Sequence, residues 1–180
     1  MSKMVIINFV LFQAAWFACV LGAAHGMPWL GVIATIFVIV WHLKQAKEAK
    51  QEAILLMITL IIGATFDQLM NSTNLIHYQS HGWSDALVPV WILALWAGFV
   101  TALNVSLRWM QGKWLVAIFF GAVGGPLAYM GAAKLGAVTL NTYPQSYLAL
   151  SIGWAILTPV LLILAKRYDG YLDKNGLDNV

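Results

Sequence analysis

The chain has 180 residues and a formal net charge of +3, with 61% hydrophobic and only 9% charged residues. Soluble domains carry about 45–50% apolar and about 25% charged residues, so this composition excludes an ordinary soluble fold and predicts a membrane protein. The small positive charge does not indicate nucleic-acid binding, because Lys and Arg gather at the ends of apolar runs.

Six apolar runs divide the sequence. A helix needs about 20 apolar residues to cross a hydrocarbon core of about 30 Å. We therefore predict an all-α polytopic membrane protein, with a six-helix transmembrane bundle over residues 1–167 and a polar cytoplasmic tail at 168–180. The predicted spans are residues 4–24, 28–43, 53–71, 86–107, 114–133 and 147–165.

The first run has two interpretations. It follows Lys3 and ends in small residues at 22–24, as a secretory signal with a cleavage site does. However, Asn8, Gln13 and Trp16 are unusual inside the apolar core of a signal, and the run is long. We predict that it is retained as a membrane span. The second run is short, and its terminal Trp29 and Trp41 are typical of membrane interfaces, where we also expect His42.

The third run contains a single carboxylate, Asp67, which lies about 21 Å along the predicted helix at 1.5 Å per residue. A charge at the bilayer centre costs about 2.5–3.5 kcal/mol on insertion scales, and such side chains usually face protein or water. We therefore expect Asp67 to point inward. Thr59, Gly63, Asn71 and Asn74 share its helical face, so this face is polar.

This polar face predicts a ligand pocket, to which other runs add polar and aromatic side chains. The predicted ligand-binding residues are Asp67, Asn71, Asn74, Gln13, Trp16, Trp91 and Trp96. In this interpretation Asp67 and the amides form hydrogen bonds, while the indole rings form the walls. The alternative is a hydrogen-bonded Asp67 that only fixes the packing of the helices.

Two histidines follow the third run. His77 and His81 are spaced i, i+4, so on a helical turn both rings would face the same way and could bind a divalent metal. Asp67, Asp85 or His25 could be a further ligand. Two histidines do not make a metal site. Tyr78 and Trp83 favour the alternative of an amphipathic segment at the membrane surface.

The fifth run carries a ridge of small residues that includes Gly121 and Gly125. Such ridges let helix backbones approach closely. We predict that this face packs against another helix, and that it could join the protein to a membrane-protein partner or to a second copy. A broken helix of the transporter type at Pro126 is the alternative.

The distribution of Lys and Arg predicts the orientation. If all six runs cross, only Lys134 among the ten basic residues lies on the outer side. This positive-inside bias places both termini in the cytoplasm. No phosphate loop, dinucleotide fingerprint, nucleophile elbow or paired cysteine motif is present, because Cys19 is the single cysteine. The sequence therefore predicts no catalytic residue, and no cofactor other than the divalent metal.

The segment NFVLFQAAWFACVLGAAHG, residues 8–26, together with the six-span plan, resembles a bacterial inner-membrane family of unknown function, domain of unknown function 2878. The resemblance implies a multi-pass protein of the inner membrane. Because genes of this family often lie near fatty-acid-modifying and photolyase-like genes, it also implies a role in lipid chemistry or envelope stress. It supplies no catalytic motif.

Three functional hypotheses follow. The first is a lipid- or fatty-acid-binding or lipid-modification accessory protein, in envelope or photo-oxidative stress, with membrane lipids as its partners. The second is a small transporter or channel in which Asp67 carries a proton or cation. The third is a metal-dependent membrane enzyme that uses His77 and His81.

Overall fold

The computed structural model describes residues 3–172, and α-helices make up most of it. The helices of the described residues are α1 (Lys3–Ala24), α2 (Pro28–Gln45), α3 (Ala49–Ser72), α4 (Val90–Leu103), α5 (Trp114–Lys134) and α6 (Gln145–Arg167). A short 3₁₀ helix, η1 (Arg108–Met110), and two strands, β1 (Ile76–Tyr78) and β2 (Val138–Leu140), complete the elements. The all-α class is confirmed, and five of the helices are long and apolar enough to cross a membrane.

Helix α4 is shorter than predicted, with 14 residues in place of the span 86–107. The chain before α4 is a loop that is fixed by the side-chain amide of Gln68. This amide accepts a hydrogen bond from Val88 N at 2.7 Å and donates one to Ala86 O at 3.0 Å. Pro89 then begins the helix. Because α4 is buried on nearly all sides, its flanks are as apolar as the helix itself, and the apolar pattern does not mark its ends.

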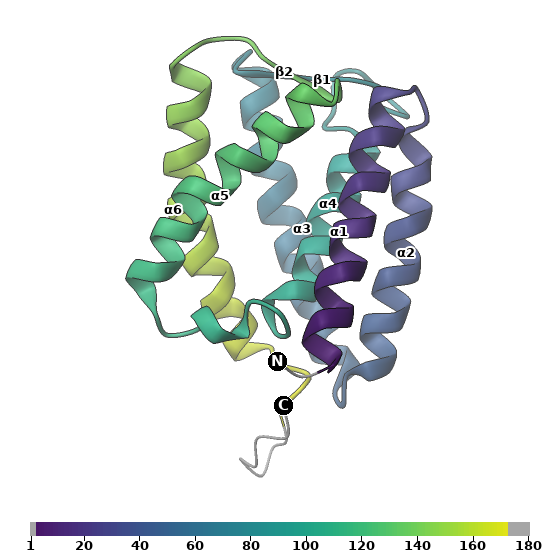
Figure 1. Cartoon of the computed structure of the whole chain (residues 1–180), viewed down its shortest axis with the longest axis vertical. Coiled ribbons are helices and arrows are strands. Elements are labelled where there is room, and N and C mark those ends of the chain that lie inside the picture. Colours follow the sequence, from purple (N-terminus) through teal and green to yellow (C-terminus); the bar gives the residue numbers. More distant parts are fainter. Residues whose placement is uncertain (1–2, 173–180) are drawn as a thin grey trace.

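The helices form two groups by their contacts, and in Figure 1 α3 runs behind the space between α1 and α6. α1, α2 and α3 pack around α4, while α5 packs mainly against α6. α5 is oblique to α1: its C-terminal end approaches α1, and its N-terminal end lies away from it. Both chain termini lie at one end of the bundle. We call this the terminal end, with the turns at residues 46–48 and 104–113, and the opposite end, with residues 73–89 and 135–144, the strand end.

A two-stranded ribbon joins the two groups at the strand end. β1 and β2 are antiparallel, with Ile76 opposite Leu140 and Tyr78 opposite Val138. The hydroxyl of Ser146 at the start of α6 donates to Leu75 O at 2.7 Å and strengthens the junction. The ribbon therefore holds the loop after α3 against the loop before α6.

The outer surface of the bundle is strongly apolar. Leu115 is 83% exposed, and Phe37 and Phe119 are each 71% exposed. A soluble monomer rarely exposes large contiguous apolar patches, because water would have to solvate them. This surface fits an environment of lipid acyl chains.

The small residues of α5 pack against α6 within the chain. A methyl group on Gly121 would collide with the backbone oxygen of Trp154, and one on Gly125 would collide with the Trp154 ring. Both glycines are buried. The expected close packing is present, but α6 covers the two positions that we expected to offer to a partner chain or a second copy.

The neighbouring glycines of α5 provide a test of this contact. We expect Gly121→Ala to lower the free energy of unfolding by about 1–3 kcal/mol, because the added carbon meets rigid backbone. Gly124→Ala is the matched control: its new methyl group would meet only the Phe120 ring at 3.8 Å, and alanine favours the helix. Denaturant unfolding of the purified protein in detergent should separate the two variants, and equal stabilities would contradict the contact.

Candidate functional site

The buried carboxylate of Asp67 connects four elements, α3, β1, α4 and α5, near the strand end. Its side chain projects from α3 and is 0% exposed, which confirms the expected inward direction. Tyr78 of β1 and Tyr129 of α5 both donate their hydroxyl groups to Asp67 Oδ1 at 2.5 Å. Trp96 of α4 donates its indole N–H to Oδ2 at 2.5 Å. Both carboxyl oxygens are thus hydrogen-bonded within the protein.

These three donors come from parts of the chain that are far apart in sequence. Tyr129 follows Asp67 by 62 residues and Trp96 follows it by 29.

Burial raises the pKa of Tyr78 well above its ordinary value, and the nearby Asp67 carboxylate raises that pKa further. Tyr78 therefore keeps its proton at neutral pH and remains a donor. This geometry favours Asp67 as an anchor of the bundle over Asp67 as a carrier of a proton or cation.

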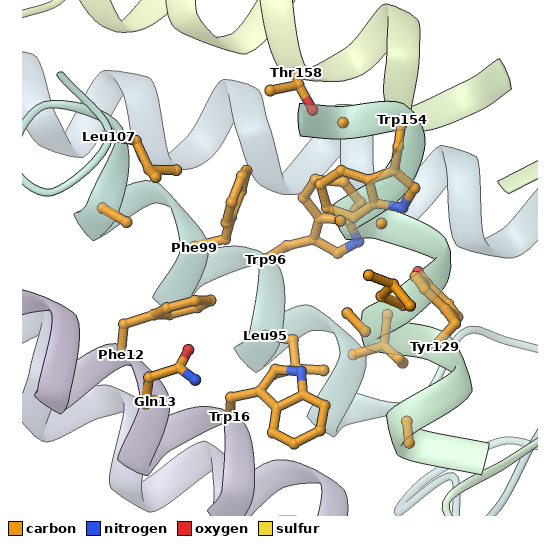
Figure 2. Close-up of a pocket in the computed structure, with 18 of the residues that line it drawn as sticks. Phe12, Gln13, Trp16, Leu95, Trp96, Phe99, Leu107, Tyr129, Trp154 and Thr158 are labelled. Carbon is orange, nitrogen blue, oxygen red and sulfur yellow. The ribbon is translucent and has the colours of Figure 1, made fainter. Parts of the chain in front are cut away.

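Two of the rings that bind Asp67, those of Trp96 and Tyr129, also line a cavity of about 450 Å³ between α1, α4, α5 and α6. Its walls are mainly apolar and aromatic, and Asp67, Trp96 and Tyr129 form a polar region toward the strand end. Figure 2 shows Trp96 stacked on Trp154, with Gln13 and Trp16 on α1 across the space. The two stacked indole rings lie 4.9 Å apart at an angle of 5°. The cavity is therefore lined by aromatic rings and lies beside the hydrogen-bonded carboxylate of Asp67.

Most of the predicted pocket residues meet at this cavity. The predicted residues that line it are Asp67, Gln13, Trp16, Trp91 and Trp96. Asn71 and Asn74 are not among the lining residues: α3 ends at Ser72, so Asn74 lies beyond the helical face that we had extended to it. Asn74 has φ of 55°, and its backbone oxygen accepts from Asn141 Nδ2 at 3.0 Å. Its role is in the turn that leads into β1.

The histidines do not form the predicted group. His77 lies in β1 and points to the exposed side, so the helical turn that its spacing from His81 required is absent. His81 Nδ1 contacts Leu87 O at 2.7 Å, and His25 Nδ1 contacts Leu21 O at 2.8 Å. Within residues 3–172, no three His, Cys, Asp or Glu side chains are placed to hold a metal ion. These contacts give His81 and His25 local roles in the loops.

Sequence reasoning missed the contribution of α5 and α6 to the cavity. Tyr129, Trp154 and Thr158 all line it. Gly125 could have indicated that a large side chain such as Trp154 packs there, because a neighbouring helix can approach closely where a helix has no side chain. The hydroxyl of Thr158 is buried and has no hydrogen-bond partner among the described residues.

A second buried polar cluster, which we did not predict, lies at the terminal end. Glu52 of α3 is 1% exposed, and its carboxylate contacts His42 Nε2 at 2.9 Å, Asn104 Nδ2 at 2.8 Å and Gly170 N at 2.7 Å. His42 is 2% exposed, so it lies inside the protein in the last turn of α2, and its predicted level at the membrane interface stays a prediction. This Glu52 cluster connects α2, α3 and α4 with the segment after α6.

The segment after α6 is correspondingly ordered. Tyr171 donates its hydroxyl to His42 O at 2.7 Å, and Asp169 pairs with Arg108 at 2.8 Å. Burial, together with the negative charge of Glu52, raises the pKa of Tyr171 above its ordinary value, so this hydroxyl also stays protonated. Residues 169–171 are thus part of the bundle, whereas we predicted a polar tail from residue 168. The remainder of that tail, 173–180, lies outside the described residues.

The apolar helices and their apolar outer surface indicate a helical membrane protein with a cavity between its helices. The model of the family described as protein of unknown function (DUF2878) matches residues 5–160. The chain belongs to this family, and the resemblance recognised from residues 8–26 is confirmed. No curated protein and no solved structure matches the chain.

Proposed function

We propose that this protein binds a lipid-like amphiphile in the cavity between α1, α4, α5 and α6. The observation that carries the proposal is an apolar cavity whose lining includes half-exposed side chains of α1 and α5, two helices whose outer faces suit lipid. In this proposal the protein is a lipid-binding or lipid-modification accessory protein of the bacterial inner membrane.

The size and lining of the cavity support such a ligand. Its volume of about 450 Å³ falls within the range of about 300–1,000 Å³ that is typical of small-molecule pockets. Its walls are mainly apolar, with a few polar groups. The hydroxyl of Thr158 has no partner among the described residues, so it can bond to a polar group of the ligand. An amphiphile with one long apolar part matches this lining.

The position of the opening supports entry from the membrane. α1 and α5 approach where a methyl group on Gly131 would lie 3.5 Å from the Trp16 ring. Toward the terminal end they diverge, as Figure 1 shows. There Phe9 of α1 and Phe120 of α5 line the cavity and are also about half exposed. Acyl chains that surround the protein would meet this apolar opening directly.

The proposed topology has six crossings, with both termini in the cytoplasm. α4 covers only about 21 Å at 1.5 Å per residue. It nevertheless connects α3, which ends at the strand end, with the turn that begins α5 at the terminal end (Figure 1). The positive-inside bias then makes the terminal end cytoplasmic. The role in envelope or photo-oxidative stress rests on the family resemblance alone and stays a prediction.

A cavity-filling variant tests the proposal. Gly124 lines the cavity, and a methyl group there would meet only the Phe120 ring at 3.8 Å, so Gly124→Leu should enter free space. We expect this variant to lose bound lipid while its stability stays unchanged or rises, because glycine inside a helix costs about 0.5–1 kcal/mol. Native mass spectrometry of protein extracted in mild detergent measures the co-purifying lipid.

Val123→Leu provides the control on the same helix, because Val123 is exposed on the outer face and does not line the cavity. It should retain lipid at the wild-type level. The proposal is wrong if no lipid co-purifies with the wild-type protein, or if Gly124→Leu retains as much lipid as Val123→Leu.

A further inference from the structure

The cavity has a direction, and its two ends differ in chemistry. Its lining on α5 runs from Phe120 to Ala132, which is about 18 Å at 1.5 Å per residue. At the strand end it reaches Val138 of β2, and at the terminal end it reaches Ser106 and Leu107. An acyl chain in the cavity would therefore lie roughly parallel to the helices, as lipid chains lie in a bilayer.

Ser106 and Leu107 begin a segment, residues 106–114, that borders the cavity at the terminal end, and we call this segment the terminal-end mouth. Figure 1 shows this segment crossing from α4 to the start of α5 at the terminal end. Trp109 and Trp114 are each about half exposed, and the ammonium group of Lys113 lies 5.5 Å from the centre of the Trp109 ring. Exposed indole rings and a lysine are typical of the level of lipid headgroups.

The charge at the terminal-end mouth is positive. Arg108 is paired with Asp169 at 2.8 Å, so these two charges largely cancel. Lys113 is exposed and precedes α5, and no side chain caps the first turn of that helix. The free N–H groups of a helix N-terminus carry a partial positive charge, which adds to that of the lysine. Among residues 3–172, no carboxylate forms an ion pair with Lys113, so a headgroup at this mouth would meet its positive charge.

We infer that the ligand is an anionic phospholipid, whose acyl chain lies in the cavity and whose phosphate headgroup lies at the terminal-end mouth beside Lys113. This inference rests on the proposed function, since it requires a lipid in the cavity. At the strand end Lys134 closes the last turn of α5, where Asp67 and Val138 line the cavity, so a phosphate there would meet the Asp67 carboxylate as well as the lysine. The headgroup position also places the ligand in the leaflet that faces the terminal end.

The test compares two lipids with the same acyl chains, one with an anionic headgroup and one with a zwitterionic headgroup. The delipidated full chain in detergent is mixed with phosphatidylglycerol or phosphatidylcholine of the same acyl composition, and bound lipid is counted by native mass spectrometry. We expect phosphatidylglycerol to bind about fivefold more tightly, as one lysine near an anionic headgroup provides. Lys113→Gln should remove this preference and leave phosphatidylcholine binding unchanged, while Lys113→Arg should keep it.

Lys134→Gln is the matched control, because it removes the same charge from the opposite end of the same helix. It should keep the preference for phosphatidylglycerol. Equal binding of the two lipids by the wild-type protein would overturn the inference, and so would an equal effect of Lys113→Gln and Lys134→Gln. In both cases the proposed function stands. If neither lipid binds, or if Gly124→Leu does not block binding, the proposed function itself fails.

Discussion

Replacement of Asp67 by alanine should lower the free energy of unfolding by about 4 kcal/mol, the largest effect that we expect from one substitution in this protein. The loss comes from three donors that remain buried without an acceptor: the hydroxyl groups of Tyr78 and Tyr129 and the indole N–H of Trp96. Each stranded donor costs about 1–3 kcal/mol. The effect should be visible in denaturant unfolding of the purified protein in detergent, followed by tryptophan fluorescence.

Two further variants separate the contributions of charge and shape. Asp67→Asn keeps the shape and one carbonyl oxygen but replaces one acceptor with an amide donor, so it should cost less than Asp67→Ala. Tyr129→Phe removes a single donor and should cost about 1.5 kcal/mol, near the lower bound for a hydrogen bond to a charged group.

Thr65→Ala is the control on the opposite face of α3, where Thr65 is exposed and bonds only to Ile61 O of its own helix. It should change stability by less than about 0.5 kcal/mol. If Asp67→Ala were no more destabilising than Thr65→Ala, Asp67 would not anchor the bundle.

Replacement of Glu52 by alanine should have a comparable effect at the other end of the bundle, about 3–4 kcal/mol. Glu52 accepts from Asn104 Nδ2 and Gly170 N and contacts His42 Nε2, and removal of one partner from a buried polar cluster leaves the others unsatisfied. The loss should also be local, because Gly170 is held through this carboxylate. Hydrogen–deuterium exchange of a peptide that covers residues 168–172 should therefore become faster in Glu52→Ala.

Asp85→Ala is the control, because it removes a carboxylate that is exposed at the strand end. This variant should keep the wild-type stability and the wild-type exchange rate of residues 168–172. Asp67→Ala is a second comparison: it should destabilise the protein without selectively loosening residues 168–172. Selective loosening by all three variants, or by none, would show that the Glu52 cluster does not hold this segment.

The burial of Asp67 could be predicted from the sequence, whereas the burial of Glu52 could not. Asp67 interrupts a charge-free apolar run, and the cost of an exposed charge in lipid is enough to predict that it faces inward. Glu52 lies just before a predicted span, close to Lys47, Glu48 and Lys50, where a solvated charge is the usual expectation. Only the return of residues 169–171 to the ends of α2, α3 and α4 buries it.

The sequence by itself determined the class of protein, the all-α architecture, the presence of six helices and the inward direction of Asp67, because each depends on local composition or on the cost of a charge in lipid. It also determined that Gln13, Trp16, Trp91 and Trp96 belong with Asp67, through their place along apolar helices. The tertiary structure alone decided the true length of α4, the exclusion of Asn71 and Asn74 from the cavity and the fate of the histidines.

The tertiary structure also decided which partners meet the two carboxylates. Tyr129 reaches Asp67 across 62 residues, and Gly170 reaches Glu52 across 118. An α-helix repeats every 3.6 residues, so the sequence predicts which side chains share one face of a helix. It does not predict which other helix that face will contact. The pairing of helices depends on crossing angles, small-residue contacts and loop geometry, which form only when the whole chain packs.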